Sequence, residues 1–346
     1  MQLETRWKQV KRFLKTNPVT RGPVWWALNS RARLRWRLVH HGASLAYPRV
    51  INIETTNYCN EKCWFCPRAE ATRGFGFVSL DLVKRIVDEG VPHGGVTYYL
   101  HKDGEPLMHP QILDIIAYMK GAHPRNQVRL TTNGTLLKEE TARRLLELGI
   151  DQLRVGVRAA TRETYKRVHK KDHFDRVKAN VERFLQLKKE LRAAKPMVIV
   201  QIVVCEDTVG EIDLFRQQWG DKDVFMEIKD FMSWGGWASD GTLPADQNDD
   251  PRRPPCIDPF HNLVVNFDGK VSLCSLDWDA KVQFGHVGRQ SVLEVWHGEP
   301  VGAVRQAHLK GDFRQNPLCA NCQEWRYVPN LFWRNRLIPW KDQAWL

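Results

Sequence analysis

The chain has 346 residues, 42% of them hydrophobic, which fits one large α/β domain with a smaller second module. Its formal net charge is +12, and no apolar run approaches the ~18 residues that a membrane span needs. The N-terminus lacks the apolar core of a secretory signal. Eight cysteines without an export signal indicate metal or redox ligands rather than a disulfide framework, so we expect a cytoplasmic, reducing environment.

The positive charge is concentrated in a basic, Trp-rich N-terminal extension over residues 1–48. Its first 41 residues contain ten Lys or Arg and one acid, and the apolar residues of a predicted helix share one face. Such a segment either packs as a basic helix against the following domain, which we favour, or lies on an anionic membrane surface. The basic residues are confined to this segment and no nucleic-acid-binding module is recognisable, so nucleic acid is not an expected partner.

From residue 50 onward, predicted strands alternate with predicted helices. The strands are predicted at 50–54, 96–101, 127–132, 151–157, 197–205 and 223–229. The helices between them carry recognisable end signals, such as Ser79 as an N-cap and Gly149 as a C-terminal stop. Six such steps imply a parallel sheet with right-handed crossovers, although they do not by themselves separate an open sheet from a barrel.

Three cysteines follow the first strand in the string ETTNYCNEKCWFCPR. Cys59, Cys63 and Cys66 have the spacing C-x3-C-x2-C, and three thiolates can ligate three irons of a four-iron cluster while leaving the fourth open. Zinc also binds closely spaced cysteines, but it needs a fourth ligand and none lies in this loop. The motif resembles the cluster loop of radical S-adenosylmethionine (SAM) enzymes.

The resemblance implies an α/β fold, a partial (β/α)6 TIM-like barrel that we place at residues 49–232. It also implies a [4Fe–4S] cluster whose open iron binds SAM, and a 5′-deoxyadenosyl radical that abstracts a hydrogen atom. In such enzymes the residue at the position of Phe65 usually packs on the adenine. A flavodoxin- or ferredoxin-type partner would supply the electron.

Two further loops at strand ends resemble family motifs that contact SAM. The string KDGEP matches the G-G-E-P motif with Asp103 in place of the first glycine, and the resemblance places Gly104 and Glu105 at the SAM amino group. In the string TTNG, Asn133 is predicted to lie near SAM.

The loop after the fourth strand departs from the family pattern. Many relatives have a serine and then an acid where this chain has Gly156 and Arg158. Arg158 or Arg167 is therefore the candidate bidentate partner of the SAM carboxylate, and either of them could equally be a surface arginine.

A Pro-rich and charged linker over 233–255 precedes a second cysteine-rich module at 256–325. Its cysteines are Cys256, Cys274, Cys319 and Cys322. The pattern C-x12-G-x4-C followed by C-x2-C resembles the auxiliary-cluster module called SPASM, or twitch in its short form, and four thiolates complete one [4Fe–4S] cluster. A zinc ribbon is the alternative.

The aromatic tail at 326–346 would cap the barrel mouth, line the substrate pocket or form a dimer contact.

Cys205 belongs to neither set of cysteines. It ends a predicted strand and shares one face with Gln201, and a glutamine is more plausible inside a barrel than under its helices. The thiol would then lie beside SAM, where it could donate a hydrogen atom to a substrate radical, as in radical SAM epimerases. Alternatively, it packs as a small hydrophobic residue.

We therefore predict an enzyme that abstracts hydrogen from a carbinol carbon of a sugar, nucleotide sugar or aminocyclitol and epimerises it, with Cys205 as donor. Dehydrogenation to a ketone, with the auxiliary cluster as electron acceptor, is favoured nearly as strongly by the sequence. Peptide modification is the third candidate reaction. A non-enzymatic iron–sulfur or zinc protein would not need the SAM loops. The basic N-terminus favours an anionic partner, such as a nucleotide sugar, a lipid-linked saccharide or a membrane surface.

Overall fold

The computed structural model describes residues 46–237, 253–326, 330–333 and 335–337. The described residues from Tyr47 onward form one compact unit, and the predicted N-terminal extension lies almost entirely outside the described residues, as does most of the predicted linker. Within the described ranges, no helix is long and apolar enough to cross a bilayer.

One sheet of eleven strands runs through the described residues in the order β11-β10-β6-β5-β4-β3-β2-β1-β7-β8-β9. The strands are β1 (Val50–Ile53), β2 (Thr97–Leu100), β3 (Gln127–Thr132), β4 (Gln152–Gly156), β5 (Met197–Val204), β6 (Phe225–Asp230), β7 (Asn262–Val265), β8 (Lys270–Ser272), β9 (Gln283–His286), β10 (Asn330–Trp333) and β11 (Arg336–Leu337). Strands β1 to β6 pair in parallel, as the alternating pattern predicted. The cysteine-rich module extends the sheet from β1 through the parallel strand β7, followed by antiparallel β8 and β9.

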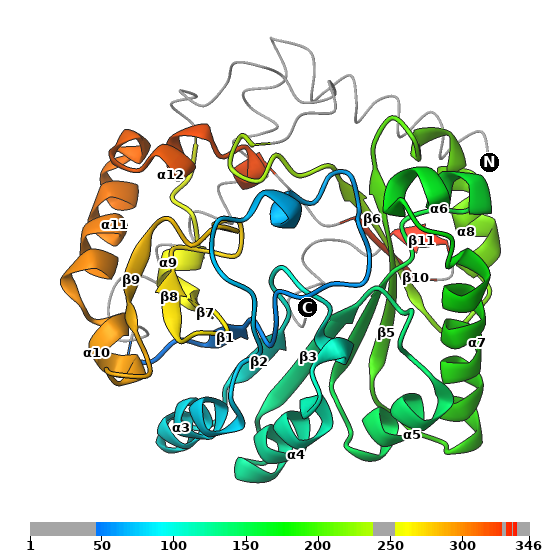
Figure 1. Ribbon diagram of the computed structural model, residues 1–346, viewed down its shortest axis with the longest axis horizontal. Coiled ribbons are helices and arrows are strands. Elements are labelled where there is room, and N and C mark those ends of the chain that lie inside the picture. The colour runs from blue at the N-terminus through cyan, green and yellow to red at the C-terminus, as the bar shows by residue number, and fades with distance from the viewer. Residues whose placement is uncertain (1–45, 238–252, 327–329, 334, 338–346) are drawn as a thin grey trace. The chain divides into compact units, whose positions relative to one another are not determined.

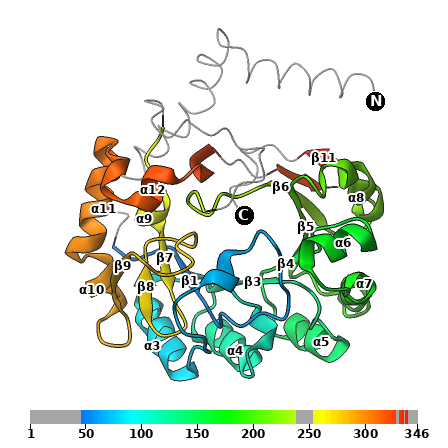
Figure 2. The same cartoon turned by 45° about the horizontal axis from the view of Figure 1, so that its top comes forward.

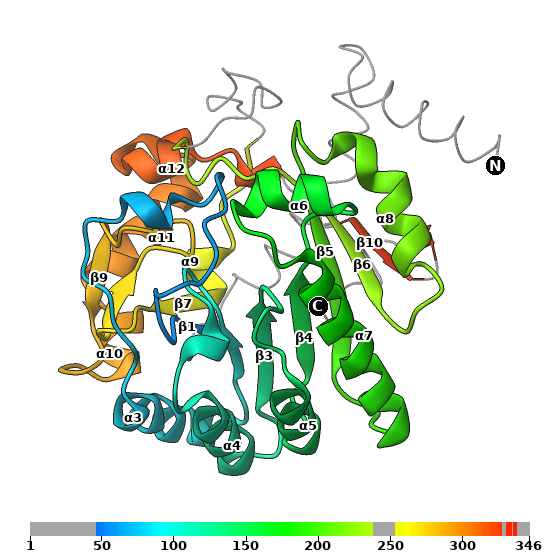
Figure 3. The same cartoon turned by 45° about the vertical axis from the view of Figure 1, so that its right-hand side comes forward.

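The longer helices cover one face of this sheet. The helices are α3 (Leu80–Gly90), α4 (Ile112–Ala122), α5 (Glu139–Glu147), α6 (Arg162–His169), α7 (Phe174–Glu190), α8 (Ile212–Trp219), α9 (Asp258–His261), α10 (Val292–Trp296), α11 (Glu299–Lys310) and α12 (Pro317–Asn321). Helices α3, α4, α5, α7 and α8 lie along the outside of the parallel strands (Figure 1 and Figure 3). The sheet curves with these helices outside, so the predicted partial barrel is confirmed (Figure 2).

The two faces of the parallel strands differ in polarity. Outward side chains such as Leu100 and Val155 are fully buried beneath the helices. The inner face mixes apolar positions such as Ile199 with polar ones, which include Arg154, Gln201 and Glu227. Parallel strands are usually apolar on both faces, so the polar inner face indicates a surface kept for binding or chemistry.

Part of the aromatic tail has a structural role that the sequence did not indicate. Strand β10 pairs antiparallel with β6 and extends the sheet at the edge opposite to β7. Phe332 is buried there, with the Arg216 guanidinium 4.4 Å from its ring centroid. The remainder of the tail, residues 338–346, lies outside the described residues.

The packing of the helices on the outer face gives a stability prediction. Leu145 on α5 is fully buried, whereas Arg144 beside it is half exposed and pairs with the exposed Glu147. Leu145→Ala is expected to lower the free energy of unfolding by about 2–5 kcal/mol, and Arg144→Ala by less than about 0.5 kcal/mol. Equal midpoints of the two variants in anaerobic urea denaturation would contradict this packing.

Candidate active site at the carboxyl edge of the sheet

The loop between β1 and α3 carries Cys59, Cys63 and Cys66, and α6 fixes its backbone. The amides of Lys62 and Trp64 donate to the carbonyls of His169 and Val168, at 3.2 and 3.1 Å. The Cys66 amide donates to the Cys63 carbonyl at 3.1 Å and closes a turn between these two cysteines. The loop is therefore held in one conformation by backbone hydrogen bonds.

A buried carboxylate, Glu61, fixes the same loop through side chains. His173 Nδ1 lies 2.8 Å from this carboxylate, the Tyr165 hydroxyl donates to it at 3.1 Å, and His169 Nδ1 is 3.7 Å away. The sequence analysis missed this group. Its signal was the four-residue spacing of Tyr165 and His169, which puts both side chains on one face of α6, whereas His173 comes from the start of α7.

Nitrogen donors surround the sulfur atoms of the loop. His169 Nδ1 lies 3.4 Å and Arg158 Nη1 3.6 Å from Cys63 Sγ, while Asn133 Nδ2 lies 3.9 Å from Cys59 Sγ. Burial alone would raise the pKa of Cys63, but the charges of His169 and Arg158 lower it to about 7. Such donors also tune the reduction potential of a bound cluster.

The other two thiols of the loop are held protonated by their surroundings. Burial, with the charge of Glu105, raises the pKa of Cys59 to about 11, and burial, with the charge of Cys63, raises that of Cys66 to about 12. Iron would supply the positive charge that these thiolates lack. The donor set therefore fits an iron–sulfur cluster bound by Cys59, Cys63 and Cys66.

Phe65, the predicted adenine contact, is buried within the loop. Its ring packs edge-on against Phe231, with the centroids 6.2 Å apart, and the Arg158 guanidinium lies 5.2 Å from its centroid. The Trp234 indole donates to the Phe65 carbonyl at 2.9 Å. The ring therefore has a fixed position beside the cluster cysteines, and its contact with adenine remains a prediction.

The loop after β2 presses against the cluster loop at Gly104. A Cβ atom at this position would lie 2.0 Å from the Thr56 carbonyl oxygen, so only glycine fits. The Glu105 amide donates to the Tyr58 carbonyl at 2.8 Å. Gly104 therefore allows the backbone of the loop after β2 to lie against the backbone of the cluster loop. This role does not depend on a contact between Gly104 and SAM.

Glu105 organises the next loop, which carries Asn133. Its buried carboxylate accepts hydrogen bonds from the Asn133 amide at 2.6 Å, the Thr132 hydroxyl at 2.7 Å and the Leu107 amide at 3.0 Å. Burial raises the pKa of Glu105 to about 7 in spite of these donors. Asn133 then reaches the cluster loop, where its Nδ2 donates to Asn60 Oδ1 at 2.8 Å. The contacts of Glu105 and Asn133 with SAM remain predictions.

The structure separates the two arginines proposed for the SAM carboxylate. Arg158 lies beside Cys63 and has a φ of 59°, a strained value that often marks a functional position. Arg167 is half exposed and pairs with Asp207 at 2.8 Å. The structure therefore brings Arg158, and not Arg167, to the cluster thiols.

Gly156 makes room for the Arg158 side chain. A Cβ atom at position 156 would lie 2.9 Å from Arg158 Nε. The two departures from the serine and acid of many relatives therefore depend on each other, because the Arg158 guanidinium occupies the space that a side chain at position 156 would take.

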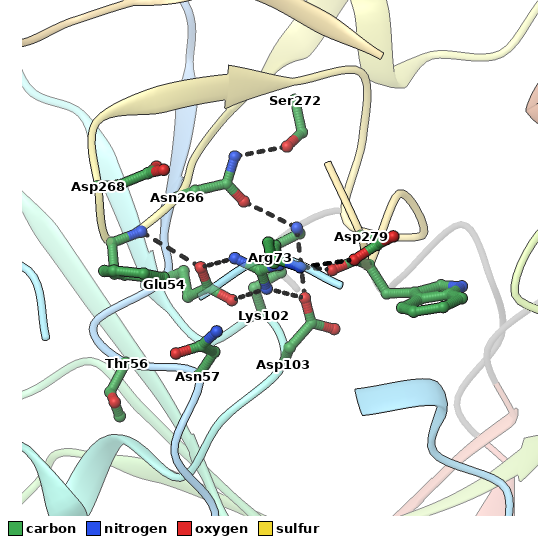
Figure 4. A network of polar contacts seen from close by, with 12 residues as sticks. Glu54, Thr56, Asn57, Arg73, Lys102, Asp103, Asn266, Asp268, Ser272 and Asp279 are labelled. Carbon is green, nitrogen blue, oxygen red and sulfur yellow. Dashed lines mark hydrogen bonds and ion pairs between the residues drawn. The ribbon is translucent and has the colours of Figure 1, made fainter. Parts of the chain in front are cut away.

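Asp103, the other departure from the family motif, belongs to a buried network of charges (Figure 4). Its Oδ2 lies 2.8 Å from Arg73 Nη2 and 3.3 Å from Lys102 Nζ. Arg73 also makes a bidentate contact with Glu54 at the end of β1. Lys102, Asp103 and Glu54 are almost completely shielded from solvent, so the opposite charges compensate one another in a poorly solvated place.

The same network reaches the cysteine-rich module. Lys102 Nζ donates to Asn266 Oδ1 and to the Asp277 carbonyl, both at 2.8 Å, and Arg73 Nε donates to the Trp278 carbonyl at 2.8 Å (Figure 4). The Asp277 amide in turn donates to the Cys274 carbonyl at 3.2 Å. Arg73 in the loop after β1 and Lys102 in the loop after β2 thus hold these two loops to the loop of Cys274.

The four cysteines of the second module act on one another electrostatically. They are Cys256, Cys274, Cys319 and Cys322. Burial raises the pKa of all four thiols, and charges on the neighbouring thiols raise those of Cys256 and Cys274 further. His308 joins two of these cysteines, because its Nδ1 accepts from the Cys256 amide at 3.0 Å and its Nε2 lies 3.4 Å from Cys319 Sγ. This donor set fits a second iron–sulfur cluster.

Comparisons with known families agree with both sites. The profile of the radical SAM superfamily matches residues 53–214, and that of the SPASM iron–sulfur cluster-binding domain matches residues 256–323. The chain belongs to the radical SAM superfamily and is a radical SAM enzyme with a C-terminal SPASM domain. Its cofactors are therefore SAM and iron–sulfur clusters, as predicted, rather than zinc.

Among relatives, the SAM-dependent 2-deoxy-scyllo-inosamine dehydrogenase of Niallia circulans is 23% identical over 279 residues, covering 79% of this chain and 92% of the relative. The GTP 3′,8-cyclase of Paenarthrobacter nicotinovorans is 30% identical over 135 residues, 38% of each chain. The structure of BtrN in complex with AdoMet and 2-DOIA has a TM-score of 0.55 at 21% identity and covers 80% of this chain and 92% of BtrN. That of Streptococcus suis SuiB bound to the precursor peptide SuiA has a TM-score of 0.60 at 14% identity, covering 82% and 72%. These structural similarities establish the fold and leave the substrate open.

The pairing of Gly156 with Arg158 gives a prediction for SAM binding. In Gly156→Ser the guanidinium must move, and because it is the end of a flexible side chain, stability is expected to change little. SAM affinity is expected to fall about tenfold or more, the effect of losing a hydrogen bond to a charged group. Gly121→Ser, at a position with open space around it, is the control. Unchanged SAM affinity by equilibrium dialysis would remove Arg158 from the SAM site.

The buried network gives a second prediction. Arg73→Met leaves Glu54 and Asp103 short of a cation in a buried place, and we expect a loss of about 3–5 kcal/mol in the free energy of unfolding. Arg144→Met removes an equal charge from an exposed pair and serves as the control. Anaerobic urea denaturation measures both variants, and equal midpoints would show that the network does not stabilise the fold.

Proposed function

We propose that this enzyme oxidises a secondary alcohol of a small hydroxylated substrate to a ketone. The proposal departs from the epimerisation that the sequence favoured, and one observation carries it. Cys205, the candidate hydrogen donor, is covered by protein, and the residue is 1% exposed.

The surroundings of Cys205 are those of a packed residue. Its thiol lies 3.5 Å from the Thr208 hydroxyl, which donates to the Val203 carbonyl at 2.5 Å. It packs in one apolar cluster with Phe65, Val168, Val203 and Phe231. A thiol that gives a hydrogen atom to a substrate radical must touch that radical, and these contacts leave it no open side.

An oxidation also needs a second acceptor, because removal of one hydrogen atom leaves one electron and one proton to be lost. When bound, SAM and the two clusters would supply hydrogen-atom abstraction at the carbinol carbon and an acceptor for the remaining electron. In this chain, hydrogen bonds from Lys102 and Arg73 hold the loop of Cys274 to the loops that follow β1 and β2. The dehydrogenase from Niallia circulans supports the same reaction class by similarity.

Epimerisation with Cys205 as donor is the second candidate. The observation in its favour is the contact of Cys205 with the Phe65 cluster, which places the thiol beside the SAM loop at the end of β5. A displacement of Phe65 by bound substrate would be needed to uncover it.

A reductant of the flavodoxin or ferredoxin type is required for either reaction and remains a prediction. Membrane contact through the N-terminal extension also remains a prediction, because almost all of that extension lies outside the described residues.

The test is anaerobic turnover in deuterated water with sugar phosphates, nucleotide sugars and aminocyclitols, comparing wild type with Cys205→Ala. We expect a product lighter by two hydrogen atoms, formed equally by the variant. In Cys274→Ala we expect 5′-deoxyadenosine to form while the ketone is lost. Cys63→Ala, which cannot form 5′-deoxyadenosine, is the control.

A redox-neutral product with one deuterium on carbon, lost in Cys205→Ala, would overturn the proposal in favour of epimerisation. Ketone formation by Cys274→Ala at the wild-type rate would remove the auxiliary cluster from the reaction.

A further inference from the structure

Arg253, near the end of the predicted linker, is a buried arginine beside the cysteines of the SPASM domain. The residue is 6% exposed, and its Nη2 donates to the Cys319 carbonyl at 2.8 Å. The same carbonyl accepts from the Cys322 amide at 3.2 Å, so the guanidinium lies against the turn that joins these two cysteines. A residue that the sequence placed in the linker therefore belongs to the second cluster site.

Aromatic rings hold this guanidinium in place. The Cζ atom of Arg253 lies 4.0 Å from the ring centroid of Phe313 and 5.9 Å from that of Trp325. Phe313 packs edge-on against His308, with the centroids 5.1 Å apart, and His308 Nε2 lies 3.4 Å from Cys319 Sγ. Arg253 is thus one member of a packed group around Cys319, and cation–π contacts keep its charge there.

Two of the three guanidinium nitrogens of Arg253 have no hydrogen-bond partner among the described residues. These are Nε and Nη1, and both are buried. Buried donors on a charged group are costly when they are left unsatisfied. A bound cluster has thiolate and sulfide acceptors, so the unpaired N–H groups fit a site that the cluster completes.

The charges of this site also favour a cation. Burial lowers the pKa of Arg253, while the charges of three of the four SPASM cysteines raise it. Glu324 adds negative charge, because its Oε2 lies 3.1 Å from Cys322 Sγ. A guanidinium stays protonated under these conditions, so Arg253 offsets part of the negative charge of the thiolates and the carboxylate.

We propose that Arg253 raises the reduction potential of the auxiliary cluster through its charge and through hydrogen bonds to sulfur. A positive charge stabilises the reduced cluster, which carries one more electron, and hydrogen bonds to sulfur act in the same direction. This effect needs only the bound cluster. Its value for the reaction rests on the proposed oxidation, in which the electron that remains after hydrogen-atom abstraction needs an acceptor.

The test is an anaerobic redox titration of the reconstituted full-length enzyme, followed by electron paramagnetic resonance. Added SAM alters the signal of the SAM cluster and so separates it from that of the auxiliary cluster. In Arg253→Met the ratio of reduced to oxidised auxiliary cluster at a fixed potential is expected to fall about tenfold, a shift of about 59 mV for one electron. Arg253→Lys, which keeps the charge, is expected to lie closer to wild type than to Arg253→Met.

Arg305→Met is the matched control. Arg305 is also buried in the SPASM domain, and its Cζ lies 4.1 Å from the ring centroid of Trp296. It donates to the carbonyls of Pro259 and Trp296, both at 2.8 Å. Burial lowers its pKa to about 10, and no thiol contributes to this shift. We therefore expect Arg305→Met to leave the potential of the auxiliary cluster unchanged.

Equal potentials of the auxiliary cluster in wild type and Arg253→Met, or an equal fall in Arg305→Met, would overturn the inference. Iron content and the signal of the SAM cluster report whether Arg253→Met is folded, and Arg253→Gln serves if it is not. Because the titration needs no turnover, a lowered potential in Arg253→Met without ketone formation by the wild type would refute the oxidation and leave the inference standing. Ketone formation with equal potentials would do the reverse.

Discussion

Four buried charges hold the loops of this enzyme in register. Arg73 and Lys102 lie against Glu54 and Asp103, and none of them has enough water to be stable alone. Because the desolvation of each charge is offset only by its partners, the set is stable as a whole and unstable with any member removed. Its hydrogen bonds to Asn266 and to the carbonyls of Asp277 and Trp278 extend this requirement to the SPASM domain. Asp103 in place of a family glycine is thereby explained, since it completes the charge balance.

The two faces of the parallel strands have different roles: the outer face stabilises the fold, and the inner face carries polar groups that are available for chemistry. Outward residues such as Leu100 and Val155 are apolar and fully buried under the helices, where burial of apolar area stabilises the fold. Inward residues such as Arg154 and Glu227 are polar, and these two form an ion pair. The inner face can therefore carry charges suited to a ligand without weakening the packing of the helices. Cys205 is an exception, because it lies at the inner end of β5 and yet is enclosed by apolar side chains.

The thiols show how far the protein alone prepares its cluster sites. His169 and Arg158 stabilise the Cys63 thiolate, whereas burial keeps the pKa of Cys59 and Cys66 high. In the SPASM domain burial raises the pKa of all four thiols. Metal binding to such sites must displace protons, so cluster assembly and the final stability of these loops are linked.

The sequence by itself determined the features that depend on neighbours along the chain. The spacing of Cys59, Cys63 and Cys66, the alternation of strands and helices, and the stop at Gly149 are all local, and the structure contains the elements they predict. Tertiary structure decided everything that depends on residues far apart in sequence. Lys102 and Asp277 are separated by 175 positions, so no local pattern announces their contact. The choice of Arg158 over Arg167 and the enclosure of Cys205 have the same cause, because strand order and side-chain direction fix which distant groups lie close together.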